Sequence, residues 1–438
     1  MSESPRMKKV LLGAALILTV TATALADEAP PAVYDPDPQH VFNRLYAAIA
    51  VRTEGGKRFG IDNVTAFSER FDDSAQVAAL ADELVARKDL VTSLGELKRS
   101  LLLHDVWTAF DVAALFDDRK ALRPLARAVR VLAMDEQSIA RLPDDYADAV
   151  RSGAFAKDFD PQHADRAFLP ADLFDPQGPW IQLGEIGVDI VAPMHMSAVG
   201  ARSAFMVFIR CPGGREATLG YLNTLNLYRA PLALVQDPIA TAYEPSGERP
   251  VRSDVVMLDR KTPQFPPGTV VALVRQMAVV NNKLQPVMTR ITQSIQFRVY
   301  KTTDWDWSRD ARENFQKSQH PFEVTMTRAD LLARRTGGLH QLADDETSQE
   351  LTGSVRMEWT RAQKLRGPVV MSTCLRCHGG PGIFSVNAYS GLFDDSRRRA
   401  LNPSLIPSVD PDYQRQTTMS RKMQRYDWGL LQGILTAD

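Results

Sequence analysis

The chain has 438 residues, of which 44% are hydrophobic and 24% charged, a composition that fits an ordinary soluble protein of more than one domain. Its 52 basic and 53 acidic side chains nearly cancel, which argues against a nucleic-acid-binding protein and against electrostatic docking on anionic lipid. Three cysteines in a chain of this length exclude a disulfide-stabilised scaffold.

The first 26 residues have the three parts of a secretory signal peptide. Lys8 and Lys9 precede an apolar run over residues 10–20, and the small residues Ala24 and Ala26 frame a cleavage site. The run is shorter than the about 20 residues that cross a bilayer. We therefore expect export to the periplasm, removal of residues 1–26 and no transmembrane anchor in the mature protein. An uncleaved membrane anchor is the alternative.

The next two regions are a leader and a helical domain. Residues 27–40 are rich in Pro, Ala and acidic side chains, which is typical of a flexible leader. Residues 41–160 place apolar residues three and four apart with charges between them, and Pro is nearly absent. This pattern predicts four to six antiparallel helices. Within them, His104 beside Asp105 is expected to have a structural role.

Residues 161–301 are predicted to form an antiparallel β domain. Apolar residues are grouped in short runs with many β-branched side chains, and turn residues separate them. The strongest candidates for strands are SAFMVFIR (203–210), GTVVALVRQMAVV (268–280) and SIQFRVYK (294–301). A hairpin or longer turn is expected near 279–283, and the strand 295–300 is expected to close the sheet.

Residues 302–438 are more polar, with helical stretches, turns and a short helix expected at about 420–435. The predicted fold class is therefore α+β with several domains. This last region contains Cys374, Cys377 and His378 in the order Cys-x-x-Cys-His, which is the attachment motif of c-type haem.

The chemistry of haem attachment explains this spacing. Two thiols add to the two vinyl groups of the porphyrin and form thioethers, and the histidine directly after the second cysteine then presents its imidazole to the iron. The other ring nitrogen usually donates to a backbone carbonyl, which fixes the tautomer. The glycines at 379, 380 and 382 let the chain turn close to the ring.

Three other interpretations of the motif remain open. A zinc site needs four ligands, and Cys211, the third cysteine, lies far away in the predicted β domain. A thioredoxin-type redox pair would follow a buried strand and begin a helix, whereas GPVVMST is short and GGPG follows at once. A structural disulfide between Cys374 and Cys377 would be strained.

The segment CLRCHGGPG resembles the haem-binding segment of c-type cytochromes, and the resemblance covers at most the last ~70 residues. It implies one haem c, with Cys374 and Cys377 as thioether anchors and His378 as the proximal iron ligand. The first 300 residues resemble no cytochrome domain.

Small cytochromes of this kind also use a methionine further along the chain as the sixth ligand. Met419 and Met423 fall at suitable distances after His378, and His340 is an alternative axial ligand. Each has an ordinary structural interpretation as well, since a methionine in a helix usually fills a core and His340 could lie in a surface loop.

Two further features concern the predicted β domain. Met194, His195 and Met196 could bind copper, but on a strand both methionines would share one face and pack. Cys211 is expected to be a buried free thiol.

The sequence thus favours electron transfer through one covalently bound haem, with a redox partner protein and without nucleic acid. A haem-dependent peroxidase or other oxidoreductase, or a gas sensor with an open iron site, is the first alternative. A periplasmic binding module in which haem is auxiliary is the second, because the first 300 residues exceed what one haem requires.

Overall fold

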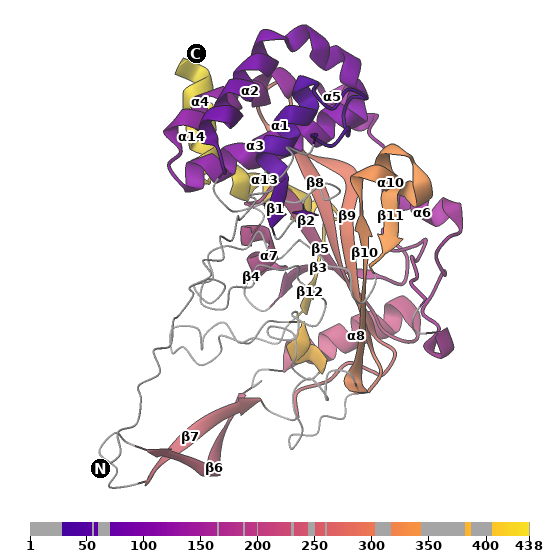
Figure 1. The fold of residues 1–438 in the computed structure, drawn as a ribbon. Helices are drawn as coiled ribbons and strands as arrows, with labels where there is room; N and C mark the ends of the chain where they lie inside the picture. Colours follow the sequence, from indigo (N-terminus) through magenta and orange to yellow (C-terminus); the bar gives the residue numbers. More distant parts are fainter. Residues whose placement is uncertain are drawn as a thin grey trace, which may run out of the picture.

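The protein is a mixed structure of helices and one large antiparallel sheet (Figure 1), seen in a computed structural model. The structure describes residues 29–54, 57–59, 71–163, 166–186, 189–198, 200–228, 232–243, 250–258, 261–302, 317–342, 382–386 and 405–437.

The described residues between 41 and 152 are mainly helical, which agrees with the helices predicted for residues 41–160. The helices are α1 (Val41–Ala50), α2 (Ser74–Ala86), α3 (Gly95–Leu115), α4 (Arg119–Leu132), α5 (Glu136–Ala140) and α6 (Asp145–Ser152), with a short pair of strands, β1 (Arg52–Glu54) and β2 (Lys57–Phe59), after α1. Asp side chains accept hydrogen bonds from the first free N–H groups of α2, α4, α5 and α6, which explains where these helices begin.

Helix α3 is the centre of the helical layer. Residues 100–113 of this helix are all buried, because α3 contacts α1, α4, α14 and strand β8 on different sides. A helix buried on all sides carries apolar residues all round, and α3 does so except at a few polar positions. Those positions, which include His104, Asp105 and Asp111, therefore need partners inside the protein.

The large sheet has strand order β11-β10-β9-β8-β5-β3-β12, with β4 paired to β3 at its side, and its pairs are antiparallel. The strands are β3 (Ile181–Ile186), β4 (Asp189–Ile190), β5 (Ser203–Arg210), β8 (Val270–Val280), β9 (Pro286–Tyr300), β10 (Gln319–Met326), β11 (Leu339–Gln341) and β12 (Leu405–Pro407). The predicted strands 203–210, 268–280 and 294–301 are confirmed as β5, β8 and part of β9, and the predicted turn near 279–283 joins β8 to β9.

The two faces of the sheet differ in what covers them. Phe297 of β9 and Phe322 of β10 belong to a hydrophobic core shared with the helices, and we call this side the helical face. The alternate residues point the other way. This second face includes Arg298 and Tyr300 of β9, and its apolar part forms a separate core with helix α8 (Gly214–Leu227) and Phe265.

The sheet does not end at the strand 295–300, which corrects the prediction. Strand β10 pairs with β9, and β11 pairs with β10. Strand β10 was missed because alternate residues such as Glu323 are polar, so its sequence lacks a continuous apolar run. Near the other edge, β12 pairs with β3. The sheet therefore takes strands from both sides of the boundary predicted at residue 302.

The end of the chain returns to the helical layer. The single helix predicted at about 420–435 is instead two helices, α13 (Tyr413–Met423) and α14 (Tyr426–Ala437). Helix α14 contacts α3 and α4, and α13 contacts β5 and β9. Figure 1 shows both beside the helices that begin the fold.

Two smaller elements complete the described part. Helix α10 (Arg328–Leu332) and the 3-10 helix η3 (Arg335–Gly338) connect β10 to β11, and a separate two-stranded ribbon is made of β6 (Leu232–Tyr243) and β7 (Pro250–Leu258). Tyr34, within the stretch predicted to be a flexible leader, is buried at 3% exposure. Part of that leader is therefore packed against the helices.

Candidate functional site

The predicted haem motif and the signal peptide lie outside the described residues. This applies to Cys374, Cys377 and His378 and to residues 1–26. The structure does describe the short 3-10 helix η6 (Gly382–Ser385), which begins four residues after His378. The position of η6 therefore gives the nearest structural information on the motif.

Helix η6 is held against the second face of the sheet. The Ser385 hydroxyl donates to the carbonyl oxygen of Gly382 at 2.8 Å, so the Tyr300 hydroxyl is the donor in its 2.6 Å bond to the Ser385 oxygen. The Arg298 guanidinium donates to the Ser385 carbonyl at 3.1 Å. Burial raises the pKa of Tyr300, so the phenol keeps its proton.

The backbone at the beginning of η6 favours glycine. Gly382 has φ +46°, and a Cβ at this position would collide with the amide oxygen of Gln264. The same oxygen accepts a hydrogen bond from the Ile383 N–H at 3.2 Å, and Ile383 is fully buried in the core of the second face. Gly382 thus allows the chain to approach Gln264 closely. The use predicted for the glycines after the motif, a turn close to the porphyrin ring, stays a prediction.

Beyond η6 the second face becomes polar. Arg275, Gln296 and Glu323 lie on it, and each is 6% exposed or less. The Gln296 amide donates to Glu323 at 3.3 Å, and Arg275 donates to the Ser203 hydroxyl at 3.2 Å. Buried residues are usually apolar. This part of the second face differs from an ordinary hydrophobic core because its buried side chains are charged or carry amides.

His340 lies on the same face, at the edge strand β11. It pairs in register with Thr325, which pairs with Ser294. Its Nδ1 atom is 3.7 Å from a carboxylate oxygen of Asp330, and its side chain is 29% exposed. The residue is therefore in a strand, and not in a loop.

The predicted methionine ligands lie elsewhere. Met419 packs against the core shared by the helices and the helical face of the sheet. Met423, at the end of α13, is 50% exposed. Neither packs in the core of the second face, which contains Ile383.

The segment with Met194, His195 and Met196 forms a helix, α7 (Pro193–Ala198), so the strand expected there is wrong. Pro193 opens this helix, at the position where proline costs least. Met196 is buried with Phe205, and the His195 ring is 5.5 Å from the Phe205 ring. Cys211 is a buried free thiol, as predicted.

Two buried ion clusters join the helices to the rest of the fold, and neither was predicted. Asp111 of α3 binds Arg202 and, at 2.6 Å, Lys422 of α13. Lys422 also binds Asp427 at 3.1 Å. The side chain of Lys422 is 0% exposed, so this cluster fixes α13 to α3 inside the protein.

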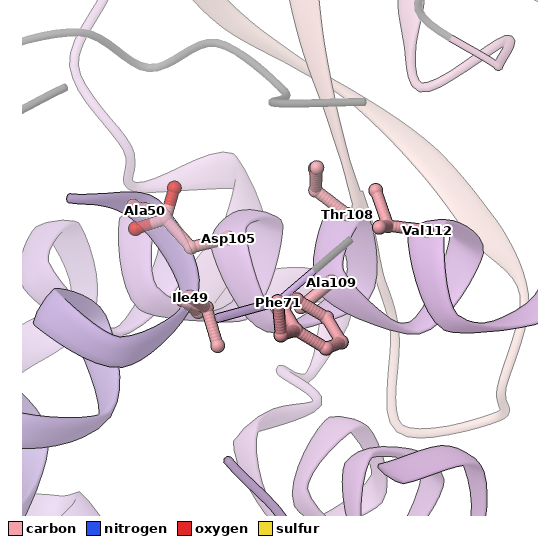
Figure 2. Close-up of a pocket in the computed structure, with 7 residues that line it drawn as sticks. All are labelled: Ile49, Ala50, Phe71, Asp105, Thr108, Ala109 and Val112. Atoms are coloured by element: carbon pink, nitrogen blue, oxygen red, sulfur yellow. The ribbon is translucent and has the colours of Figure 1, made fainter. Parts of the chain in front are cut away.

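The second cluster surrounds Asp105. Its carboxylate accepts from Arg328 at 2.5 Å and from the Tyr34 hydroxyl at 2.7 Å. Figure 2 shows the small pocket beside it, between α1 and α3, which is lined by Ile49, Ala50, Phe71, Asp105, Thr108, Ala109 and Val112. Because the Asp105 oxygens are bound and most of the lining is apolar, this pocket has no set of groups for catalysis.

The only sequence signal for these clusters was the presence of charges inside an otherwise apolar helix. That signal marks Asp105 and Asp111 as buried, but it does not identify Arg328 or Lys422 as their partners.

Comparisons with known proteins, and searches for membrane-spanning helices and metal-binding groups, do not assign a function to this chain. No family model, curated protein or solved structure matches this chain. Among the residues that the structure describes, no helix combines the length and apolar character needed to cross a bilayer. Over the same residues, no three His, Cys, Asp or Glu side chains are grouped so that they could hold a metal ion.

Proposed function

We propose that this protein is exported to the periplasm and transfers electrons through one covalently bound haem c. Cys374 and Cys377 form the thioethers, and His378 is the proximal iron ligand. The observation that carries the proposal is the Cys-x-x-Cys-His motif itself, because this spacing serves the chemistry of haem attachment and suits a disulfide or zinc site poorly.

The described residues next to the motif fit a haem segment. His378 precedes Gly382 by four residues, so the two Cα atoms are at most about 14 Å apart. Gly382 is held at Gln264, and Ser385 is held by Arg298 and Tyr300. This fixed attachment limits where the haem lies, and it favours the second face of the sheet over the helical face.

The haem supplies an iron that changes oxidation state with little change in geometry when it has two axial ligands. The polypeptide determines where the haem is held. Tyr300 and Arg298 hold the segment after the motif, and the buried side chains of the second face exclude water from one side. Low solvent exposure is one of the properties that set a haem potential.

A redox partner protein and a periplasmic location follow from the same proposal. Haem attachment to Cys-x-x-Cys-His takes place after export, and residues 1–26 have the pattern of an export signal. The near balance of 52 basic and 53 acidic side chains suits a protein partner better than a nucleic acid.

The spectrum of the matured protein tests electron transfer against an open iron site. After co-expression with a haem-maturation system, we expect a low-spin spectrum in both oxidation states and no change when carbon monoxide is added to the reduced protein. The matched control is the Cys374→Ser/Cys377→Ser variant, for which we expect no retained colour after denaturing extraction. A five-coordinate, high-spin spectrum with strong carbon monoxide binding would instead favour the sensor or peroxidase class.

A further inference from the structure

We infer that the ribbon of β6 and β7 joins two copies of this chain, through antiparallel pairing of β7 with the β7 of a second copy. The pairing is centred on Ser253 and makes one four-stranded sheet, in the order β6-β7-β7-β6. The inference does not depend on the proposed function, because it uses no residue of the haem motif.

The ribbon has no third strand within the described part of the chain. Strands β6 and β7 pair with each other, and with no other strand that the structure describes. Figure 1 shows them apart from the large sheet and from the helical layer. An isolated two-stranded ribbon is at best marginally stable in water, and further strands or a packed face are needed to hold it. A sheet shared between two copies supplies two further strands.

The two edges of the ribbon differ in how well they suit another strand. Between Gln236 and Thr241, four residues of β6 stand against a single residue of β7, Ser253. These four residues include Pro238, which has no N–H to donate. Bulges and prolines are the features that prevent pairing at a sheet edge. Beyond its first residue β7 contains no proline, and it carries no inserted residue, so its edge is the one that suits a partner strand.

The sequence of β7 is self-complementary about its middle. It reads Val251-Arg252-Ser253-Asp254-Val255, with opposite charges on the two sides of the serine. Two such strands can pair antiparallel with Ser253 opposite Ser253. Each Arg252 position is then opposite the Asp254 position of the other copy, and each Val251 is opposite a Val255. Opposite charges at facing positions stabilise a strand pair, and like charges there destabilise it.

The charge pattern selects this register over its neighbours. An antiparallel pairing centred on Arg252 or on Asp254 places that residue opposite its own copy, so that like charges face each other. Parallel pairing in register does the same at both positions. Only the antiparallel register centred on Ser253 sets both charges opposite their complements, and it repeats the same pair on each side of a two-fold axis, as a symmetric dimer requires.

The first test measures the association of the purified full chain by sedimentation equilibrium. We expect a dimer for the wild type. Arg252→Asp sets like charges at both facing pairs, so we expect the dissociation constant to rise at least about tenfold. Arg252→Asp/Asp254→Arg restores opposite charges in the reversed order, and we expect it to regain the wild-type association. An unchanged circular dichroism spectrum shows that each variant is folded.

The second test concerns the register and does not use the charge variants. Directly opposite residues of antiparallel strands have Cα atoms about 4.5–5.5 Å apart, which lies within the range that a disulfide bridges. Ser253→Cys should therefore give a disulfide-linked dimer on oxidation, seen on a non-reducing gel. The matched control is Val255→Cys. Its two copies are four residues out of register and roughly 14 Å apart, so we expect no such link.

A monomeric wild type at the highest protein concentration measured would overturn the inference. Equal association of the wild type and Arg252→Asp would show that β7 is not the interface, and equal crosslinking of Ser253→Cys and Val255→Cys would show that the register is wrong. If Arg252→Asp does not fold, the two cysteine variants decide the question. None of these results depends on haem, so failure of this inference and failure of the proposed function are distinguishable.

Discussion

Replacement of Asp111 by alanine is expected to lower the free energy of unfolding by about 3–5 kcal/mol. In the folded protein this carboxylate binds both Arg202 and Lys422, whose side chains are 5% and 0% exposed. Its removal leaves two buried positive charges, and among the described residues Asp427 then remains as the acidic partner of Lys422. Such a loss of one partner costs more than the original cluster contributes, because the remaining charges cannot regain water. Urea denaturation at neutral pH measures the difference.

The control for this prediction is Asp82→Ala. Asp82 pairs with Arg127 at 2.9 Å, but its side chain is 51% exposed, so we expect a loss of less than about 1 kcal/mol. Equal losses for Asp111→Ala and Asp82→Ala would show that the cluster does not hold α13 against α3.

Acidification is expected to destabilise the protein through His104, with a loss of about 2 kcal/mol by about pH 5. Burial lowers the pKa of His104 to about 3, and the positive charge of Arg202 acts in the same direction. Folded His104 thus stays neutral, while the unfolded chain takes up a proton below about pH 6.5. Between these two pKa values the unfolded state binds more protons, so the free energy of unfolding falls as the pH falls.

The His104→Gln variant isolates this contribution. Glutamine can still donate to the Ala278 carbonyl, which lies 2.9 Å from Nδ1 in the wild type. Buried Asp145, whose pKa is raised by burial, changes the stability in the opposite direction, but it does so in both proteins and cancels from the comparison. Urea denaturation at pH 7 and pH 5 should show that the free energy of unfolding falls less for His104→Gln than for the wild type. Identical losses would mean that His104 is protonated in the folded protein.

Helices and strands could be predicted from the sequence where one physical preference, such as burial of both faces of a strand, determines a whole segment. Strands β5 and β8 were predicted because both of their faces are buried, which requires continuous apolar runs. The helices of residues 41–160 were predicted from their apolar spacing. Strand β10 was missed because one of its faces carries polar residues, and α7 was mistaken for a strand because six residues are too few to show a helical period.

The partners of buried charges could not be predicted for a different reason. Asp105 pairs with Arg328, 223 residues away, and Asp111 pairs with Lys422, 311 residues away. Local patterns indicate that a charge is buried, but any of the 52 basic residues could be its partner until the tertiary fold is known. The same holds for the site. The motif at Cys374, Cys377 and His378 could be read from the sequence, whereas the position of His340 on the same sheet face as Ser385 could not.

The central claim is that two cysteine sulfurs and one imidazole bind a single porphyrin in the exported protein. The most direct test is the intact mass of wild-type protein purified from the periplasm of cells with active haem maturation, measured under denaturing conditions. The account predicts the mass of the chain without residues 1–26 plus one haem, and loss of that increment in Cys374→Ser/Cys377→Ser. A mass equal to the polypeptide alone, with Cys374 and Cys377 free or joined to each other, would contradict it.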